Sequence, residues 1–231
     1  MTLLGNAAVA MWWDMAREQR AEFEDWHSHE HFPERMNIPG FLRGSRWAAA
    51  DGGVGFFIFY ELDAYATLSS PDYMARLNDP TPWSKKMMPH HRNMVRSQCR
   101  VIASHGGGVG GAMLTLRLSP QPGRAEALSA HLREVLRRLP QQGSFTGAHL
   151  LHTDTPQSGL TEEQRIRGGD AAADWIVLVS GSSSDALHDI ALSLLAPKDL
   201  EPAGAAPGAL PGLFRLKFAM TREDMRANRA P

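Results

Sequence analysis

The first half of the chain alternates between strand-like and helix-like patterns of apolar positions. Apolar residues that alternate with polar ones are typical of strands, and apolar residues three and four apart are typical of amphipathic helices. The pattern predicts the order β-α-β-β-α-β up to about residue 105. The expected elements are a strand at 6–15, a helix at 17–32, strands at 41–49 and 53–62, short helices at 71–78 and 82–92, and a strand at 93–103. Pro33 is expected to end the first helix, because an interior proline lacks an amide donor and clashes with the preceding turn.

The same order of elements recurs after a glycine-rich run at residues 106–111. The expected elements are a strand at 112–118, a helix at 124–139, strands at 145–152 and 174–181, a helix at 184–195 and a strand at 213–220. Two stretches of polar or small residues, 153–172 and 197–212, offer little to bury and predict loops. The charged tail after Thr221 predicts a frayed end.

The recurrence predicts an α+β protein made of two tandem ferredoxin-like (βαββαβ) units, at residues 1–106 and 107–231. Each unit is expected to form a four-stranded antiparallel sheet with both helices on one face. The strands alternate, so the other face of each sheet is also apolar and needs cover. We therefore expect the two units to pack sheet to sheet, as a dimeric α/β barrel within one chain.

Charge and composition narrow the classes of function. Of the 24 basic and 25 acidic residues, 11 and 12 precede Gly107 and 13 and 13 follow it. Neither half has the excess of Lys and Arg that broad contact with nucleic-acid phosphates requires. No run approaches the ~20 apolar residues of a membrane span, and the first residues lack the basic region of a secretion signal. We expect a cytoplasmic protein that binds neither nucleic acid nor membrane.

Two further features have simple interpretations. Cys99 is the single cysteine, which excludes an internal disulfide and a multi-cysteine metal cluster. The run at 106–111 contains Gly-x-Gly-x-x-Gly, but a dinucleotide-binding loop opens a helix, and here a strand is predicted to follow. We interpret the run as a flexible joint between the two units.

The candidate site lies in the first unit, which holds six of the ten histidines and five of the six tryptophans. On a helix, His27 and His31 stand one above the other on the face that carries Phe23. Phe23 and Trp26 are expected to face the sheet, with both imidazoles at the margin of that packed face. A buried imidazole can be neutral near pH 7 and act as acid or base. The alternative is that both histidines only make structural hydrogen bonds.

The same segment admits metal-binding interpretations. His27, Glu30 and His31 match the His-x-x-Glu-His pattern of inverted zinc proteases, which is disfavoured because Pro33 would leave little helix to orient the ligands. A two-histidine metal site completed by His90, His91 or Glu61 is an alternative, as is a haem held by one histidine. Our prediction is a site without metal and without a tightly bound cofactor.

Other candidate residues come from segment 79–92 and from the strand at 53–62. Trp83 is expected to form part of an apolar wall, with His90, His91 and Arg92 as polar groups. Arg92 suits a carboxylate or enolate oxygen, although this segment can equally be a solvated surface loop. Tyr60 and Glu61 point to opposite faces of their strand, so that either one can face the site. The second unit shows no converging set of polar residues and is expected to be mainly scaffold.

The run Trp26-His-x-x-x-His-x-Pro-x-Arg35, followed by Pro39-Gly-Phe41 and by Arg46-Trp47, resembles the EthD-like and related families of the dimeric α/β-barrel superfamily. The resemblance covers residues 6–105, most specifically 26–47, and the second half matches only in element order. It implies a ferredoxin-like fold and an apolar, aromatic cleft between sheet and helices. His31 best matches the His-x-Pro of these families. The superfamily includes cofactor-free monooxygenases, isomerases, dehydratases, haem-binding enzymes and stress proteins.

Together, these observations predict cofactor-independent acid–base chemistry, of lyase, dehydratase or isomerase type, on a small apolar or aromatic metabolite. His31 is the expected base or acid with His27 as its partner, and Arg92 or Tyr60 would stabilise developing charge on oxygen. The expected substrate contacts are Trp26, Trp83, Phe23, Glu61, His90 and His91. The alternatives are a cofactor-free monooxygenase of aromatic or polyketide-like substrates and a non-catalytic ligand-binding or stress-response protein. The oligomeric state is open, with a homodimer as one option.

Overall fold

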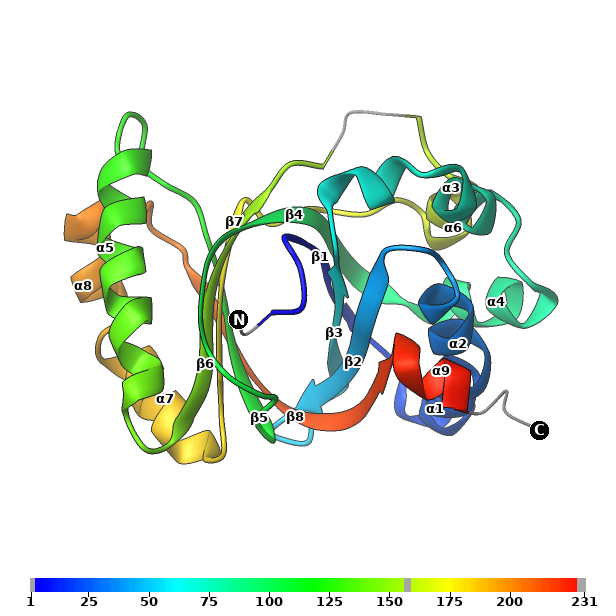
Figure 1. Ribbon diagram of the computed structural model, residues 1–231, viewed down its shortest axis with the longest axis horizontal. Coiled ribbons are helices and arrows are strands. Elements are labelled where there is room, and N and C mark those ends of the chain that lie inside the picture. Colours follow the sequence, from blue (N-terminus) through cyan, green and yellow to red (C-terminus); the bar gives the residue numbers. More distant parts are fainter. Residues whose placement is uncertain (1–2, 156–158, 228–231) are drawn as a thin grey trace.

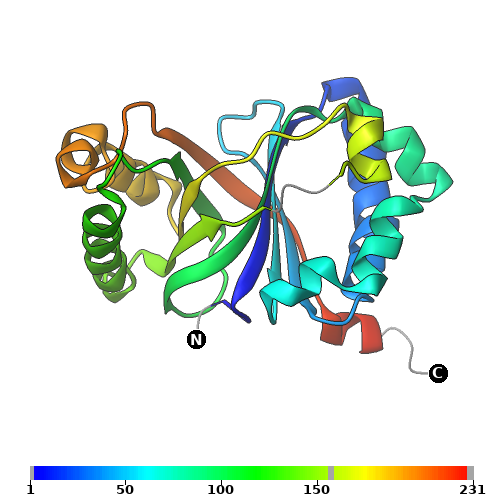
Figure 2. The ribbon, with the colours of Figure 1, turned by 90° about the horizontal axis from the view of Figure 1, so that it is seen from above.

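The computed structural model describes residues 3–155 and 159–227. Within them, eight strands close into one barrel in the order β1-β3-β2-β8-β5-β7-β6-β4, and helices cover it on two opposite sides (Figures 1 and 2). The strands are β1 (Ala7–Asp14), β2 (Phe41–Ala49), β3 (Gly55–Leu62), β4 (Arg92–Gly106), β5 (Ala112–Leu118), β6 (Phe145–Thr153), β7 (Trp175–Gly181) and β8 (Leu210–Thr221). The α-helices are α1 (Arg20–Trp26), α2 (Phe32–Met36), α3 (Pro71–Asn78), α4 (Pro82–Met87), α5 (Ala125–Arg138), α6 (Glu162–Arg167), α7 (Ser184–Leu192), α8 (Pro197–Ala203) and α9 (Arg222–Ala227).

Each half of the barrel has the strand order of a ferredoxin-like unit. The first unit runs β4-β1-β3-β2 and the second runs β8-β5-β7-β6, with every pair antiparallel. β2 pairs with β8 and β4 pairs with β6, so the two sheets join along both edges. Joining the edges satisfies backbone groups that an open sheet would expose. The predicted α+β fold, two ferredoxin-like units forming a dimeric α/β barrel in one chain, is confirmed.

The apolar faces of the strands form three packed clusters. Inside the barrel, Trp12 and Phe57 stack at 4.9 Å between ring centroids, and Trp12 Nε1 donates to Thr115 Oγ1 of the second unit at 3.2 Å. Outside the first sheet, Phe23 and Phe56 belong to the cluster beneath α1–α4. Outside the second sheet, the leucine stripe of α5 packs beside α7 and α8. The helices thus cover the outer faces of the barrel.

The helix at the candidate site continues past Pro33, contrary to the prediction. A 3₁₀ turn at Arg17–Gln19 leads into α1, a π-helical turn follows at His27–His31, and α2 continues to Met36. The amide of Phe32 donates to the carbonyl of His27, five residues back. This wider turn gives the proline ring the space that a regular turn would fill, and Pro33 sits in the first turn of α2, where proline is tolerated.

Short helices replace parts of the predicted loops and tail. α6 lies in the stretch 153–172, α8 lies in 197–212, and α9 follows Thr221. α6 begins with a capping box, in which Thr161 accepts from the amide of Gln164 and the Gln164 side chain accepts in return. Although α6 belongs to the second half of the sequence, it lies beside α3 on the outer side of the first unit (Figure 1). Short helices of this kind depend on capping and docking, so apolar periodicity does not reveal them.

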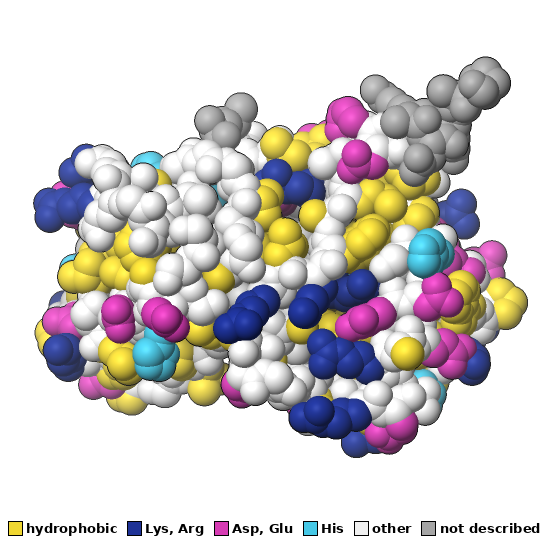
Figure 3. All heavy atoms as spheres, turned by 90° about the horizontal axis from the view of Figure 1, so that it is seen from below, with side chains coloured by type: hydrophobic (Ala, Val, Ile, Leu, Met, Phe, Trp, Pro, Cys, Tyr) yellow, Lys and Arg dark blue, Asp and Glu magenta, His cyan; other side chains and the backbone are white. Residues whose placement is uncertain are grey.

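The distribution of charged side chains on the surface is consistent with the near-zero net charge. On the face shown in Figure 3, Lys and Arg side chains are interspersed with Asp and Glu side chains. Among the residues described, no helix has the length and apolar character needed to cross a membrane.

Candidate functional site

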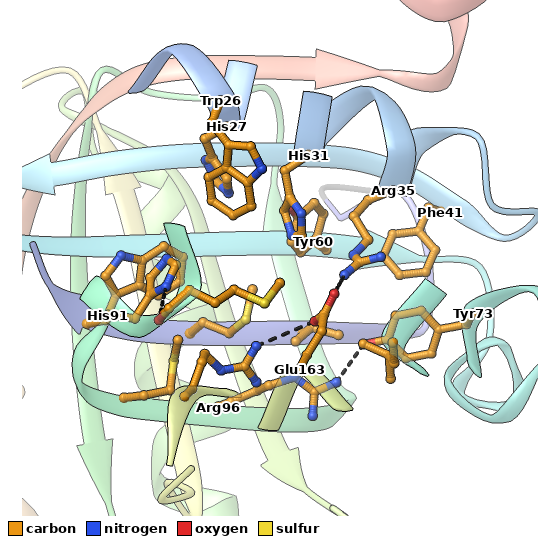
Figure 4. A pocket seen from close by; sticks show the side chains of 17 residues that line it. Trp26, His27, His31, Arg35, Phe41, Tyr60, Tyr73, His91, Arg96 and Glu163 are labelled. Carbon is orange, nitrogen blue, oxygen red and sulfur yellow. Dashed lines mark hydrogen bonds and ion pairs between the residues drawn. The ribbon is translucent and has the colours of Figure 1, made fainter. Parts of the chain in front are cut away.

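A small cavity lies between the outer face of the first sheet and the helices that cover it (Figure 4). Strands β1, β3 and β4 form its floor, the segment α1–α2 forms one wall, and α3, α6 and the turn after α4 close it. In this closed form its free volume is about 30 Å³, so an aromatic molecule can enter only if a covering element moves. The lining residues are Val9, Met11, Trp13, Trp26, His27, His31, Arg35, Phe41, Tyr60, Tyr73, Leu77, Met88, His91, Met94, Arg96, Glu163 and Arg167.

The π-helical turn presents His27 and His31 to this cavity. Their rings stack at 5.4 Å between centroids with planes 19° apart. His27 also stacks on Phe23 at 5.1 Å, and His31 lies 4.6 Å from Trp26. The two imidazoles are 1% and 7% exposed. The predicted pairing on one helical face is observed, and aromatic neighbours isolate the pair from solvent.

Both imidazoles are neutral at neutral pH. Burial lowers the pKa of His27 well below its ordinary value, and the nearby positive charge of Arg46 lowers it further. Burial likewise lowers the pKa of His31, with Arg35 acting in the same direction. The Nδ1 atom of each ring has no hydrogen-bond partner within residues 3–155 and 159–227. A neutral imidazole with an open nitrogen can accept a proton from a bound molecule.

A third imidazole, that of His91, packs edge-on against Trp13 with centroids 4.7 Å apart. Its Nδ1 lies 3.0 Å from the carbonyl oxygen of Met88. A carbonyl only accepts, so Nδ1 carries the hydrogen and Nε2 is an acceptor. Burial lowers the pKa of His91 to about 3. His91, predicted as a substrate contact, therefore lines the cavity as a neutral group.

Buried arginines add positive charge to the same cavity. Arg35 pairs with Glu163, and Arg167 lies 3.4 Å from Glu163 and 2.8 Å from Asp170. Arg96 instead donates from Nη2 to the phenol oxygen of Tyr73 at 2.5 Å. Arg96 is thus a buried cation whose direct partner is neutral.

The buried charges are equal in number when the neighbouring groups are included. Glu34 lies 3.7 Å from Arg35 Nη1 and is shared with Arg76, and burial raises the pKa of its carboxyl group. Three buried guanidinium groups and three carboxylates then belong to the cluster, the groups being Arg35, Arg96, Arg167, Glu34, Asp170 and Glu163. Arg96, whose direct partner is a neutral phenol, is the buried cation best suited to attract an anionic oxygen.

Several buried polar atoms around the cavity have no hydrogen-bond partner in the described part of the chain. Besides the two imidazoles, they include the hydroxyl of Tyr60, Nη1 of Arg35 and Nε1 of Trp13. Leaving a buried polar atom unpaired costs roughly 1–3 kcal/mol, so native proteins contain few of them. Burial raises the pKa of Tyr60, which keeps the phenol protonated and able to donate. These atoms therefore form a polar lining that a bound molecule can satisfy.

Some predicted site residues lie elsewhere. Glu61 faces the barrel interior, where it accepts from Arg43 Nε at 2.6 Å and from the amide of Leu4 at 2.8 Å. The alternation along β3 decides this, because Tyr60 faces the cavity and its neighbour must face inward. Arg92 is exposed at the start of β4 and does not line the cavity. The expectations that Arg92 stabilises charge in the site and that Glu61 contacts substrate are corrected accordingly.

The remaining predicted contacts lie behind or beside the cavity. Trp83 is half-buried because α4 turns Ser84 and Met87 inward instead. His90 is half-buried outside the lining, and Phe23 is fully buried behind His27. Trp83, His90 and Phe23 thus do not reach the free volume, whereas Trp26 does.

Most of the charged lining was not predicted from the sequence. Arg35 stood in the motif of the resemblance without a role, and Arg96 shares a strand face with apolar Met94. Glu163 and Arg167 come from α6, so the second unit is more than scaffold at this point. No local signal could place Glu163 beside a residue 128 positions away. Among the described residues, no group of three or more His, Cys, Asp or Glu side chains is arranged to hold a metal ion.

Comparison with known proteins supports the fold. No protein-family model and no curated protein matches the chain. An anthrone oxidase-like protein superposes with a TM-score of 0.63 at 14% identity, over 94% of this chain and 93% of that one. A candidate monooxygenase from Fusobacterium nucleatum gives 0.62 at 7%, over 95% and 96%. A candidate chlorite dismutase gives 0.55 at 11%, over 97% and 100%. At these identities the likeness shows the ferredoxin-like dimeric α/β-barrel fold and does not single out the EthD-like family.

Proposed function

We propose that the protein is a small-molecule enzyme that removes a proton from an aromatic compound and holds the resulting anion in the cavity. The observation that supports this most is the pair of neutral imidazoles, His27 and His31, next to a cluster of buried guanidinium groups. The proposal needs no tightly bound cofactor. Its substrate class is an aromatic enol, phenol or activated methylene.

The charges around the cavity suit proton transfer from the substrate to an imidazole. A neutral imidazole takes the proton and becomes positive while the substrate becomes negative. Donors that are already aligned with the developing anion stabilise it more strongly than water would, because the enclosed site does not reorganise. Tyr60 and Arg35 each carry an unpaired donor for this purpose. His31 is the preferred base because its Nδ1 lies 3.8 Å from Glu34, whose carboxylate would stabilise the imidazolium.

The anion can then follow one of several routes. A proton returned to another atom gives isomerisation, loss of hydroxide gives dehydration, and reaction with dioxygen gives oxygenation. We favour oxygenation, since the structures similar over the whole chain include an anthrone oxidase-like protein and a candidate monooxygenase. For a methylene the balance is R₂CH₂ + O₂ → R₂C=O + H₂O. The carbon is oxidised, one oxygen atom becomes the carbonyl and the other leaves as water.

The test uses anthrone, a tricyclic ketone with an activated methylene, as the probe. We expect oxygen uptake that matches the appearance of anthraquinone and needs no added metal or cofactor. Without oxygen, we expect the methylene to exchange protons with heavy water at an enzyme-dependent rate. Exchange without oxygen uptake in air would replace oxygenation by the isomerase or lyase alternative. Binding without exchange or uptake would overturn the proposal in favour of a binding protein.

A further inference from the structure

Helix α6 seals the cavity from outside the first unit. It lies beside α3 and the turn after α4, and contributes Glu163 and Arg167 to the lining. The Glu163 side chain is 5% exposed. With α6 in place, the free volume is about 30 Å³, so an aromatic substrate cannot enter unless an element moves. α6 is therefore the first element to consider for that movement.

The carboxylate of Glu163 occupies the position of an anion in this site. It pairs with Arg35 (Figure 4). It also lies 3.4 Å from Arg167. Arg35 is anchored in α2, directly after the histidine segment, whereas Glu163 arrives from the other half of the chain. A carboxylate and an enolate or phenolate oxygen make the same charge-assisted hydrogen bonds to a guanidinium group. Glu163 thus resembles a substrate oxygen supplied by the protein itself.

α6 is held mainly by polar contacts. Its apolar contact with the core cluster is Ile166, which is only partly buried. Its other fixed points are the Arg35–Glu163 pair and a 3.3 Å hydrogen bond from the amide of Glu162 to Asn78. A segment with few buried apolar contacts opens at lower free energy than the core does.

Two glycines form the C-terminal cap of α6, where the amide of Gly169 donates to the carbonyl of Gln164 at 2.8 Å. Gly168 and Gly169 have φ of 87° and 94°, and an added Cβ at either position would meet nothing within 4 Å. Beyond them the chain is fixed again, since Ala171 exchanges backbone hydrogen bonds with Met94 and Arg96 of β4. The left-handed glycine pair therefore ends the helix, and the chain is fixed to β4 from Ala171 onward.

We propose that Glu163 is a built-in competitor for an anionic substrate, and that the substrate's charged oxygen displaces Glu163 from Arg35 and releases α6. This rests on the proposed function for the location of the site and adds that the site binds the anionic form of its ligand more tightly than the neutral form. Only molecules with α6 open can bind, so the apparent affinity equals the affinity of the open form multiplied by the fraction of molecules that are open. A neutral ligand of the same shape enters only when α6 opens by itself, and it competes with Glu163 for Arg35 only after it has lost a proton.

The test compares two flat tricyclic probes, 9-anthracenecarboxylate and the neutral 9-anthracenemethanol, in binding titrations. Glu163→Gln removes the competing charge, so we expect it to bind the carboxylate probe at least about tenfold more tightly, equivalent to about 1.4 kcal/mol. Affinity for the neutral probe is expected to stay unchanged. Glu162→Gln is the matched control, because Glu162 is exposed on the same helix and pairs with Arg165. An equal change for both probes in Glu163→Gln would overturn the proposal.

A second measurement uses the unaltered protein, in case Glu163→Gln does not fold. Hydrogen exchange of the amides in 162–167 is expected to accelerate when the carboxylate probe binds, and to stay the same with the neutral probe. Exchange that stays the same or slows with the carboxylate probe would contradict release of α6. Neither measurement depends on turnover, so absent oxygen uptake would count against the proposed reaction alone.

Discussion

The imidazole rings of His27 and His31 are stacked over a distance of 5.4 Å, at an angle of 19°, inside an aromatic shell. Residues four apart on an α-helix already share a face, and the π-helical turn that contains both residues keeps them together while it admits Pro33. Such turns are frequent at functional sites. Burial is the main cause of the lowered pKa of both rings, and Arg35 and His27 lower the pKa of His31 further.

Removing either imidazole is expected to slow the reaction. His31→Gln and His27→Gln keep a polar group of similar size and lose the base, so oxygen uptake with anthrone should fall by about 10²–10⁴-fold. The measurement is initial rate against anthrone concentration. His188→Gln is the control, because His188 is exposed on α7 on the opposite side of the barrel. Uptake that is unchanged in both site variants would remove the histidines from the chemistry.

Stability is expected to fall as the solution becomes acidic. Burial lowers the pKa of His27, His31 and His91 in the folded protein, the last to about 3, whereas unfolded histidines titrate near 6.5. The unfolded chain then binds more protons below pH 6.5, so each such imidazole removes about 1.4 kcal/mol of unfolding free energy per pH unit. Urea unfolding at pH 7.5, 6.5 and 5.5 measures this.

The same titration identifies the groups responsible. Between pH 6.5 and 5.5, the unfolding free energy of His91→Gln should fall less than that of the unaltered protein, and the difference should equal the contribution of one imidazole. The unfolding free energy of His188→Gln should fall as much as that of the unaltered protein. A pH dependence that is identical in all three proteins would contradict this assignment. Buried His149, whose pKa is also lowered to about 3, is expected to contribute in the same direction.

The hydrogen bond between Tyr73 and Arg96 is expected to stabilise the folded protein. Tyr73→Phe deletes the hydroxyl that accepts from Arg96 Nη2 at 2.5 Å and leaves a buried guanidinium with fewer partners. Hydrogen bonds to charged groups contribute about 1.5–3 kcal/mol, so the free energy of unfolding should fall by that amount. Tyr65→Phe is the matched control, since the Tyr65 hydroxyl donates to the carbonyl of Asp154 near the surface. Equal losses in the two variants would show that burial of Arg96 is not the cause.

The absence of a side chain at Gly44 is expected to be necessary for the position of Phe32 beside His27. A Cβ at this position of β2 would collide with the ring of Phe32, which lies 4.4 Å from His27 between ring centroids. Gly44→Ala should cost about 1–3 kcal/mol through overpacking and lower activity by displacing Phe32 against the imidazole. Gly143→Ala, where an added Cβ meets nothing within 4 Å, is the control. Full activity in Gly44→Ala would show that Phe32 does not hold His27 in place.

Local patterns in the sequence were sufficient for the order of the elements and for part of the site. The strand at 112–118 has the predicted bounds, because alternation along one strand depends only on its own residues. The pairing of His27 with His31 follows from helical spacing in the same way. Helix α6 and the course of the chain through Pro33 were not predicted, because a capped six-residue helix and a widened turn leave weak apolar periodicity.

The sequence by itself determined which side chains share a face of a strand or helix. Only the tertiary structure decided which faces meet: that Tyr60 rather than Glu61 lines the cavity, and that Glu163 reaches Arg35 across 128 positions of the chain. The physical reason is that the two kinds of information act over different distances along the chain. Periodicity records the local geometry of the backbone, whereas the docking of α6 depends on charges and surfaces that exist only after the barrel has closed.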